Sequence, residues 1–536
     1  MKILTSEQMQ WVDRLTTDRY GIPGLLLMET AGSSAAKIIE ERFPQARRFK
    51  IFCAKGNNGG DGAVIARHLW LRHRHVALYL IGKVEDTRGD ARVNFEIIQK
   101  LAKTESTIAF HQVSSFDELQ PVISEPCDVY IDALFGTGAA RPLEGIYRQL
   151  VEALNTSTIP IVSVDIPSGL AANSSEIIGT TVRATLTIAM SAPKIANLLP
   201  PASYLNGELQ IVPIGSPDPL IAESGAFLNL VDRQHIADFL TKSRRRAGSY
   251  KNEVGHVMVI AGSRGKSGAA GLAALAALRA GTGLVTVFTP ADSAQYLAQA
   301  GLEIMTEPVA QTDEGTISIN ALKQLLEASN KKSVIACGPG LGTHAETREL
   351  VKELLLQAKL PLVLDADALN CITLWPEALK GSSLRPVIIT PHPGEMTRLL
   401  AACAGKTLAP DLHTRTEQIR ELAISRGIFV ALKGEKTLLA DPNGQVYVNS
   451  TGNAGLATAG TGDVLTGIVA GMIAQYPKDV LEATLSAIYL HGLAGDIAAR
   501  QLGQRSMIAS DVLAALPAAI LEVGGELETR NYNRPA

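Results

Sequence analysis

Residues 449–463 read Asn-Ser-Thr-Gly-Asn-Ala-Gly-Leu-Ala-Thr-Ala-Gly-Thr-Gly-Asp and separate a short apolar run from the helical pattern of residues 464–469. A glycine-rich loop that leads into a helix presents unpaired backbone N–H groups and the positive end of the helix dipole, which together favour phosphate. Gly460 and Gly462 lack the Cβ atoms that would keep an anion away from the backbone. The stretch therefore predicts a phosphate-binding loop.

Asp463 ends this loop, although a carboxylate repels phosphate. One use for it is as a base that takes a proton from a hydroxyl group attacking a phosphoryl group. The other is to stabilise the first turn of its own helix by interacting with the helix dipole. The spacing alone leaves both interpretations open.

Composition limits the class of protein. A chain of 536 residues is too long for one hydrophobic core, so two or more domains are expected. The net charge of −3 gives no electrostatic reason to expect nucleic acid as a partner. The five cysteines form no CxxC pair, and the N-terminal residues lack the apolar core of a signal peptide. We therefore expect a cytoplasmic enzyme with reduced thiols, bound neither to a membrane nor to nucleic acid.

The first half of the chain begins as an α/β unit. Helices are predicted at residues 6–17, 24–43 and 63–72, and strands at residues 49–53 and 76–81. A strand, helix and strand in this order predict a parallel sheet with a right-handed crossover. The connecting run Gly-Asn-Asn-Gly-Gly-Asp-Gly at residues 56–62 is not the GxGxxG of a dinucleotide fold. Its Asn57 and Asn58 offer amide oxygens for an alkali cation, or simply form a tight turn.

Two further predicted strands, at residues 129–131 and 161–164, end in Asp132 and Asp165. Open parallel sheets bind ligands beyond the carboxyl ends of their strands, so both carboxylates and the 56–62 loop are expected to line one crevice. The apolar sheet behind Asp165 would disfavour its charge and leave a carboxyl group able to donate and accept protons. Alternatively, Asp165 only holds the turn at residues 169–170 by hydrogen bonds.

The second half repeats the alternating pattern. Buried parallel strands are predicted at residues 257–260, 284–288, 334–337, 362–364 and 387–390, with alanine-rich helical stretches between them. Residues 213–225 are rich in proline, glycine, serine and alanine, so the boundary between the domains is predicted there.

Acidic and histidine side chains follow two of these strands. His392 and Glu395 lack HExxH spacing, so a hydrogen-bonded loop is favoured over a metal pair. Asp365 and Asp367 are interpreted equally well as helix caps or as magnesium ligands.

The motifs of the first half resemble those of the NAD(P)H-hydrate epimerase domain. They are residues 56–62, 132–138 with the continuation to Gly145, and 164–169. This resemblance implies a Rossmann-like three-layer α/β/α domain, a catalytic role for Asp165, and potassium bound by Asn58, Asp132 and Ser168. The positions implied to bind the hydrated nicotinamide nucleotide are Asn57, Asn58, Gly59, Gly60, Asp61, Gly136, Thr137, Gly138, Ala139, Ala140, Arg141, Pro142 and Asp165. Thr30 departs from the family, which usually has Asn there.

Most of residues 226–520 resemble the ribokinase-like NAD(P)H-hydrate dehydratase domain, on the motifs at 338–342, 365–370, 390–396, 432–437 and 452–467. The resemblance implies ADP as co-substrate, Mg²⁺, and Asp463 at the catalytic centre. The positions implied to bind the hydrated nicotinamide nucleotide are Gly342, His392, Pro393, Gly394, Glu395, Met396, Thr397, Arg398 and Asp463. Those implied to bind the adenine nucleotide are Lys433, Gly434, Glu435, Lys436, Thr437, Asn453, Ala454, Gly455, Leu456, Ala457, Thr458, Ala459, Gly460, Thr461 and Gly462.

Both resemblances together imply a fused repair enzyme, with an epimerase domain at residues 1–217 and a dehydratase domain at residues 226–520. Phosphorylation of the C6 hydroxyl of hydrated NADH or NADPH would turn it into a good leaving group, giving NAD(P)H, AMP and phosphate. We also expect a homo-oligomer. The alternative is a ribokinase-like vitamin kinase whose N-terminal half is a binding module without catalytic activity.

Overall fold

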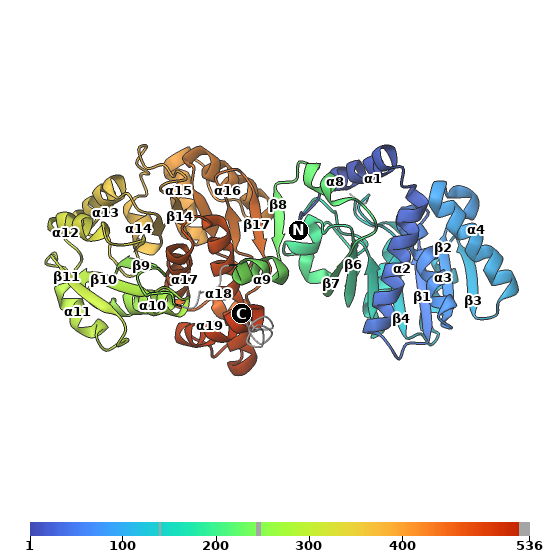
Figure 1. The fold of residues 1–536 in the computed structure, drawn as a ribbon. Helices are drawn as coiled ribbons and strands as arrows, with labels where there is room; N and C mark the ends of the chain where they lie inside the picture. The colour runs from blue at the N-terminus through green and yellow to red at the C-terminus, as the bar shows by residue number, and fades with distance from the viewer. Residues whose placement is uncertain (139–140, 243–247, 525–536) are drawn as a thin grey trace. The chain divides into compact units, whose positions relative to one another are not determined.

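The protein was analysed as a computed structural model that describes residues 1–138, 141–242 and 248–524. The chain forms two compact units. One consists of Met1–Leu228 and Asp411–His413, and the other of Asn229–Pro410 and Thr414–Ala536 (Figure 1). Ala139 and Ala140, two of the implied substrate contacts, lie outside the described residues.

The first unit is built on a seven-stranded sheet of order β3-β2-β1-β4-β5-β6-β7, and every neighbouring pair in it is parallel. Its strands are β1 (Arg48–Cys53), β2 (His75–Ile81), β3 (Ile108–Val113), β4 (Val129–Ala133), β5 (Ile161–Val164), β6 (Leu186–Met190) and β7 (Glu208–Val212). Its helices are α1 (Ser6–Tyr20), α2 (Gly24–Arg42), α3 (Asn57–Leu71), α4 (Gly89–Thr104), α5 (Phe116–Ser124), α6 (Gly145–Thr156), α7 (Ile195–Leu198) and α8 (Asp218–Glu223), with short 3₁₀ turns η1 (Val84–Asp86) and η2 (Ala202–Leu205).

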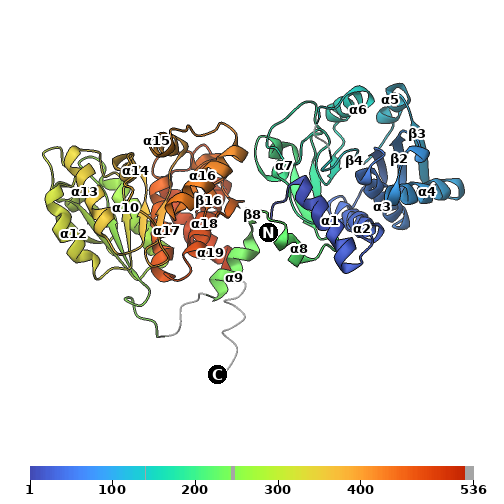
Figure 2. The same cartoon turned by 90° about the horizontal axis from the view of Figure 1, so that it is seen from above.

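Helices cover both faces of this sheet (Figure 2). Alternate residues of a strand point to opposite faces. Ile51 and Ile131 therefore pack with α2, α3 and α4, whereas Phe52 and Tyr130 pack with α5 and α6. The result is a three-layer α/β/α unit.

The second unit contains a ten-stranded sheet of order β11-β10-β9-β12-β13-β14-β15-β16-β17-β8. Pairing is parallel from β11 to β15, and β16 runs antiparallel to both of its neighbours. The strands are β8 (Leu228–Val231), β9 (His256–Ile260), β10 (Leu284–Pro290), β11 (Met305–Val309), β12 (Val334–Cys337), β13 (Leu362–Leu364), β14 (Val387–Ile389), β15 (Phe429–Leu432), β16 (Leu438–Ala440) and β17 (Val446–Asn449).

This sheet also lies between two layers of helices. Val257, Val259 and Val285 pack with α10, α17, α18 and α19 in one core, and Figure 1 shows α12 to α16 on the other side of the sheet. The helices are α9 (Arg233–Lys242), α10 (Ser267–Arg279), α11 (Ala291–Leu297), α12 (Leu322–Ser329), α13 (Ala345–Gln357), α14 (Ala366–Cys371), α15 (Pro393–Ala404), α16 (Leu412–Arg426), α17 (Thr461–Gln475), α18 (Val480–Leu502) and α19 (Ala509–Gly524), with 3₁₀ turns η3 (Ile319–Ala321) and η4 (Ala454–Leu456).

The α/β fold class predicted for both halves is confirmed, and the strands predicted from the sequence all form, with parallel pairing. One local prediction is wrong: residues 57–62 are not a loop, because α3 already begins at Asn57. The short helix α8 also forms inside the stretch 213–225, where no periodicity was recognised. The two compact units divide between Leu228 and Asn229.

Glycine in the first turns of α3 allows this helix to lie directly on its neighbours. A Cβ atom on Gly59 would lie 1.9 Å from the carbonyl oxygen of Ala54. A Cβ atom on Gly62 would lie 2.6 Å from the side chain of Ala133 and 2.7 Å from that of Cys53. The glycines were interpreted as turn residues, but close packing of a helix on a strand explains them better.

None of the five cysteines forms a disulfide, and two of them, Cys53 and Cys337, are buried. Among the residues that the structure describes, no helix is both long and apolar enough to cross a membrane.

We predict that Gly59→Ala destabilises the first unit. The added methyl group would gain about 1 kcal/mol of helix propensity but meet the Ala54 carbonyl at less than contact distance, and overpacking costs about 1–3 kcal/mol or more. Gly56→Ala is the matched control, because nothing lies within 4 Å of its Cβ position. Differential scanning calorimetry should show a lower melting temperature for Gly59→Ala and little change for Gly56→Ala. Equal melting temperatures would contradict the packing argument.

Candidate functional site

The first unit contains a cavity of about 720 Å³ at the carboxyl ends of its central strands. Asn57, Asn58 and Asp61 reach it from the start of α3, and residues 134–138 reach it from the end of β4. Asp165, directly after β5, lies in the same wall. The structure thus brings together three segments that the sequence places far apart. Of the other implied substrate contacts, Gly59 and Gly60 lie buried in α3, and Arg141 and Pro142 are not among the lining residues.

Asp165 is paired with a buried lysine. Lys194 Nζ lies 2.5 Å from Asp165 Oδ1 and also donates to the carbonyl oxygen of Met190 at 3.0 Å. Both side chains are buried. The expectation that an apolar sheet behind Asp165 disfavours its charge therefore left out a positive partner, the Lys194 ammonium group. The sequence carried a signal for Lys194, because the polar run Ser191-Ala192-Pro193-Lys194 follows β6 at the same edge of the sheet.

Among the described residues, Asp165 shares this cavity with three further carboxyl groups, of which Asp13 on α1 and Asp61 on α3 have raised pKa values; the third is Asp90 on α4. Burial raises the pKa of Asp13 to about 6, with the Lys194 charge acting against and the Asp165 charge adding to the shift. Burial and the charges of Asp165 and Asp13 raise the pKa of Asp61 well above its ordinary value. Sequence reasoning missed Asp13, because nothing in the sequence of an amphipathic helix indicates which cavity it covers.

Asp132 lies behind the cavity and is completely buried. It accepts hydrogen bonds from Ser168 Oγ at 2.6 Å, from Ser163 Oγ at 2.8 Å and from the Ser168 backbone N–H at 2.9 Å. Burial raises the pKa of Asp132, and these hydrogen bonds act against that shift.

Oxygen atoms near Gly136 make a cradle that a side chain would fill. A Cβ atom on Gly136 would lie 3.1 Å from Asn58 Oδ1 and 3.1 Å from Asp165 Oδ2. Asn58 Nδ2 is buried and has no hydrogen-bond partner among the described residues. Oxygen donors of this kind suit a hard cation, and Asn58 is one of the three potassium ligands that the resemblance implies. The other two, Asp132 and Ser168, hydrogen-bond each other.

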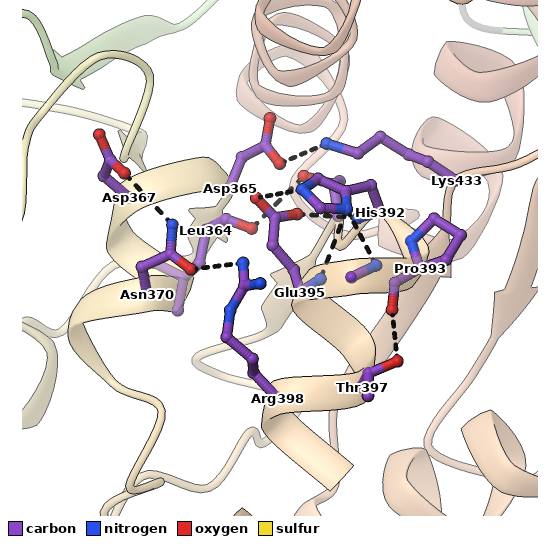
Figure 3. A network of polar contacts seen from close by, with 12 residues as sticks. Leu364, Asp365, Asp367, Asn370, His392, Pro393, Glu395, Thr397, Arg398 and Lys433 are labelled. Atoms are coloured by element: carbon purple, nitrogen blue, oxygen red, sulfur yellow. Dashed lines mark hydrogen bonds and ion pairs between the residues drawn. The ribbon is translucent and has the colours of Figure 1, made fainter. Parts of the chain in front are cut away.

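In the second unit, polar groups follow four adjacent strands, β12 to β15. Parallel pairing therefore puts Gly342, Asp365, His392 and Lys433 at one edge of the sheet. Figure 3 shows the last three of them close together. Lys433 Nζ lies 2.6 Å from Asp365 Oδ1, and Thr466 Oγ1 on α17 donates to Asp365 Oδ2 at 2.7 Å.

Asp365 stands at the N-cap position of α14, but its side chain makes no capping hydrogen bond. Asp365 was interpreted as either a helix cap or a magnesium ligand, and the structure excludes a capping role for its side chain. Its carboxylate instead connects the end of β13 to Lys433 and to α17. Asp367, in the first turn of α14, accepts a hydrogen bond from the Gly342 backbone N–H at 2.9 Å.

Asp463 lies in the first turn of α17, where the charges of Asp365 and Lys433 act on it. Burial raises the pKa of Asp463 to about 7, and the carboxylates of Asp365 and Asp367 add to the shift while Lys433 acts against it. A carboxyl group with a pKa near neutrality is suited to accept a proton from a hydroxyl group. Asp463 therefore has the electrostatic surroundings of a general base.

The start of α17 is open to an anion. Its N-cap is Gly460, with φ of 91°, which has no side chain to accept hydrogen bonds from the first turn. A Cβ atom on Gly462 would lie 3.2 Å from Lys433 Nζ, so the ammonium group stands beside this helix end. N–H groups, a helix dipole and a lysine meet here, an arrangement suited to phosphate.

Two side chains from α18 hold the loop before α17. Asp496 accepts hydrogen bonds from the Gly452 backbone N–H at 3.0 Å and from Asn453 Nδ2 at 2.8 Å. His491 Nε2 donates to the carbonyl oxygen of Thr461 at 3.0 Å, and burial lowers the pKa of His491 to about 4, so the ring stays neutral. Neither contact was predicted from the sequence. They fix the predicted nucleotide loop from Asn453 to Gly462 in place.

His392 and Glu395 form a capping box, as the hydrogen-bonded interpretation predicted. His392 Nδ1 accepts from the N–H groups of Gly394 and Glu395, and Glu395 Oε2 accepts from the His392 N–H at 2.8 Å. Arg398, one turn later, donates to Asn370 Oδ1 at 2.8 Å (Figure 3). Within the described parts of the chain, no group of three or more His, Cys, Asp or Glu side chains is arranged to hold a metal ion.

Of the implied adenine-nucleotide residues after β15, Gly434 and Glu435 are exposed, whereas Lys436 and Thr437 are half-buried. The Thr437 carbonyl accepts from the Asn449 backbone N–H at 3.0 Å, which ties this turn to the start of the 449–463 loop. Burial lowers the pKa of Lys436. These residues and the phosphate loop therefore border the same region.

Comparison with known protein families gives a match for each half. Residues 257–518 match the family described as NAD(P)H-hydrate dehydratase, and residues 24–196 match the family described as YjeF-related protein N-terminus.

Relatives match over nearly the whole chain. The bifunctional NAD(P)H-hydrate repair enzyme of Moorella thermoacetica is 41% identical over 532 residues, covering 99% of this chain and 98% of the relative. The enzyme of the same name from Escherichia coli is 30% identical and covers 94% of this chain and 91% of its own length. A solved ADP/ATP-dependent NAD(P)H-hydrate dehydratase from Bacillus subtilis, co-crystallized with ATP/Mg²⁺, is 30% identical; the match covers 55% of this chain and 98% of that one, with a TM-score of 0.47. On the full-length similarity, this chain belongs to the family of bifunctional NAD(P)H-hydrate repair enzymes.

Proposed function

We propose that the chain repairs hydrated NADH and NADPH in two steps on two domains. The first domain interconverts the R and S hydrates at C6, and the second dehydrates the S hydrate with ADP, giving NAD(P)H, AMP and phosphate. The observation that carries the proposal is the position of Asp463, a carboxyl group with a pKa of about 7 beside Lys433 and an open helix N-terminus.

The proposed dehydration uses three groups of the second domain. Asp463 takes the proton of the C6 hydroxyl as its oxygen attacks the terminal phosphoryl group of ADP. The N–H groups at the start of α17 and the Lys433 ammonium receive the charge that develops on that phosphoryl group, in the way preorganised donors stabilise a transition state. The Asp365 carboxylate positions Lys433 through their contact at 2.6 Å.

Magnesium fits this domain as a companion of the nucleotide rather than as a permanently bound ion. Mg²⁺ is usually held by one or two carboxylates together with substrate phosphates. Of the two magnesium candidates named from the sequence, Asp365 is occupied by Lys433 and Thr466, which leaves Asp367, a carboxylate near Asp463. We propose that Asp367 helps to hold Mg²⁺ when ADP is bound, where the ion would neutralise phosphate charge.

The alternative of a vitamin kinase with an N-terminal binding module is not favoured. Similarity to bifunctional repair enzymes extends over 99% of the chain, including the cavity of the first unit. A module used only for binding would not need a buried ion pair and two further carboxyl groups with raised pKa values in its cavity. A cytoplasmic location and self-association of the chain stay predictions.

For the first domain we propose that Asp165 is catalytic and that potassium is bound by Asn58, Asp132 and Ser168. The Lys194 contact requires a change in the proposed role of Asp165. Its Oδ1 atom lies 2.5 Å from the Lys194 ammonium group, and we therefore propose that Asp165 is the proton acceptor of the reaction. A potassium ion near Asn58 Oδ1 would add positive charge beside a phosphorylated substrate.

We predict that Asp463→Asn abolishes dehydration and leaves epimerisation intact, because the two sites lie on separate sheets. In the wild type, kcat/KM for dehydration should rise with pH through about 7 and then level off, since the base must lose its proton. The recovery of reduced-nicotinamide absorbance from the S hydrate and ADP measures the dehydration rate of the variant and the pH dependence of the wild type. Dehydration by the variant at the wild-type rate would exclude Asp463 as the base.

We predict that potassium stabilises the first unit and supports epimerisation. An ion that binds only the folded state stabilises it by RT ln(1 + L/Kd), where L is the free ion concentration, so the melting temperature rises as the ion concentration rises. The shift should occur with potassium chloride, be absent with tetramethylammonium chloride at equal ionic strength, and disappear in Asn58→Ala. Equal melting temperatures and epimerisation rates in the two salts would refute the potassium assignment.

We predict that Asp165→Asn slows epimerisation by at least about a hundredfold, the usual scale for a lost acid–base group. Asn keeps the shape of the side chain but cannot shuttle protons, so substrate binding should stay near normal. Proton NMR of the two epimers measures the rate, with dehydration of the S hydrate as the internal control. A slowdown of only a few-fold would favour a structural role for Asp165.

A further inference from the structure

We propose that Asp13 on α1 is the proton donor of the epimerisation, paired with Asp165 as the proton acceptor. The inference rests on the proposed epimerase function and adds to it a catalytic residue. Asp13 lies outside the part of the chain that matches the family of the N-terminal half, which begins at residue 24.

Asp13 is a carboxyl group in the wall of the cavity, and one of its oxygen atoms has no protein partner among the described residues. Asp13 lines the cavity from α1. Its Oδ1 is buried and has no hydrogen-bond partner in the part of the chain that the structure describes. A buried polar atom without a partner is costly, so a group that the cavity receives is expected to satisfy it.

Asp13 belongs to an electrostatic cluster around one ammonium group. Lys194 is in contact with Asp165, and both influence the protonation of Asp13 from the ends of β6 and β5. Asp61 on α3 is influenced by Asp13 in turn. The other titratable side chains of the cavity wall are Arg14, Lys55, Asp90 and Tyr147. A single buried ammonium cannot neutralise three carboxylates, so the cluster favours bound protons, and the pKa of Asp13 is raised to about 6.

The two carboxyl groups supply what epimerisation needs. Asp13 gives its proton to the C6 hydroxyl. The C6–O bond then breaks, the oxygen keeps the bonding electron pair, and water leaves. The N1 lone pair forms an N1=C6 double bond at the same time. Water then adds to the other face of C6, the π electrons return to N1, and Asp165 takes the proton that the water loses. The reaction consumes no other reagent. Asp13 and Asp165 have then exchanged protonation states, so the reverse conversion can start from the product.

The test compares Asp13→Asn with Asp18→Asn, a matched control on the exposed part of the same helix. NMR exchange between the R and S hydrates of NADH is measured, with the uncatalysed rate subtracted. Asp13→Asn should slow epimerisation in both directions by at least about a hundredfold, whereas Asp18→Asn should match the wild type. Asp13→Glu keeps a carboxyl group and should recover part of the lost rate.

The pH profile separates a proton donor from a structural residue. A donor must be protonated, so wild-type kcat/KM should fall as pH rises through about 6, and this limb should vanish in Asp13→Asn. The inference would be overturned if Asp13→Asn epimerised at the wild-type rate. It would also be overturned if kcat/KM of the variant were lower but still fell through the same pH range. If Asp13→Asn does not fold, a wild-type profile that is flat between about pH 5 and 8 would overturn it, and the predicted limb would support it. A wild type without epimerase activity would instead reject the proposed function.

Discussion

Parallel pairing of neighbouring strands is the constraint on which both sites depend. It brings the carboxyl ends of β1, β4, β5 and β6 to one edge in the first unit, and those of β12 to β15 to one edge in the second. Groups as distant in sequence as Asn58 and Lys194, or Asp365 and Lys433, then become neighbours. The polar groups of both sites lie at the carboxyl ends of these strands or in the segments that follow them, the end at which open parallel sheets bind ligands.

A buried aspartate–lysine pair lies at the centre of each site. Asp165 with Lys194 and Asp365 with Lys433 are at 2.5 and 2.6 Å, and in both pairs at least one side chain is almost fully buried. Removing either partner would leave a buried charge uncompensated, which is strongly unfavourable. The pairs also have electrostatic consequences. The neighbouring carboxyl groups, Asp13 in one unit and Asp463 in the other, have pKa values of about 6 and about 7 because burial and a second carboxylate outweigh the attraction of the lysine.

The glycines at the start of α3 and at the start of α17 have different functions, although both lie in glycine-rich runs of the sequence. In α3, Gly59 and Gly62 allow the helix to approach Ala54, Cys53 and Ala133 more closely than any side chain would permit. At α17, the positive φ of Gly460 and the missing Cβ of Gly462 leave the helix end open beside Lys433. The two glycine-rich runs look alike in sequence. Only the atoms that surround them show that the glycines of α3 permit close packing of the helix, whereas Gly462 lies beside the Lys433 ammonium group.

The sequence by itself determined the alternation of strands and helices, the α/β class of both units and the polar residues that end each strand, because these depend on local hydrophobic pattern. It also indicated the capping box of His392 and Glu395, a contact within one helical turn. It did not reveal the Lys194 partner of Asp165, the position of Asp13 over the cavity, the contact of Asp365 with Thr466, or the support of the phosphate loop by Asp496 and His491. Each of these joins elements that are distant in the chain, and burial, which shifts the pKa of Asp13 and of Asp463, arises only when those elements pack. Residue types and spacing fix what chemistry is available, whereas tertiary packing decides which groups meet and in which protonation state.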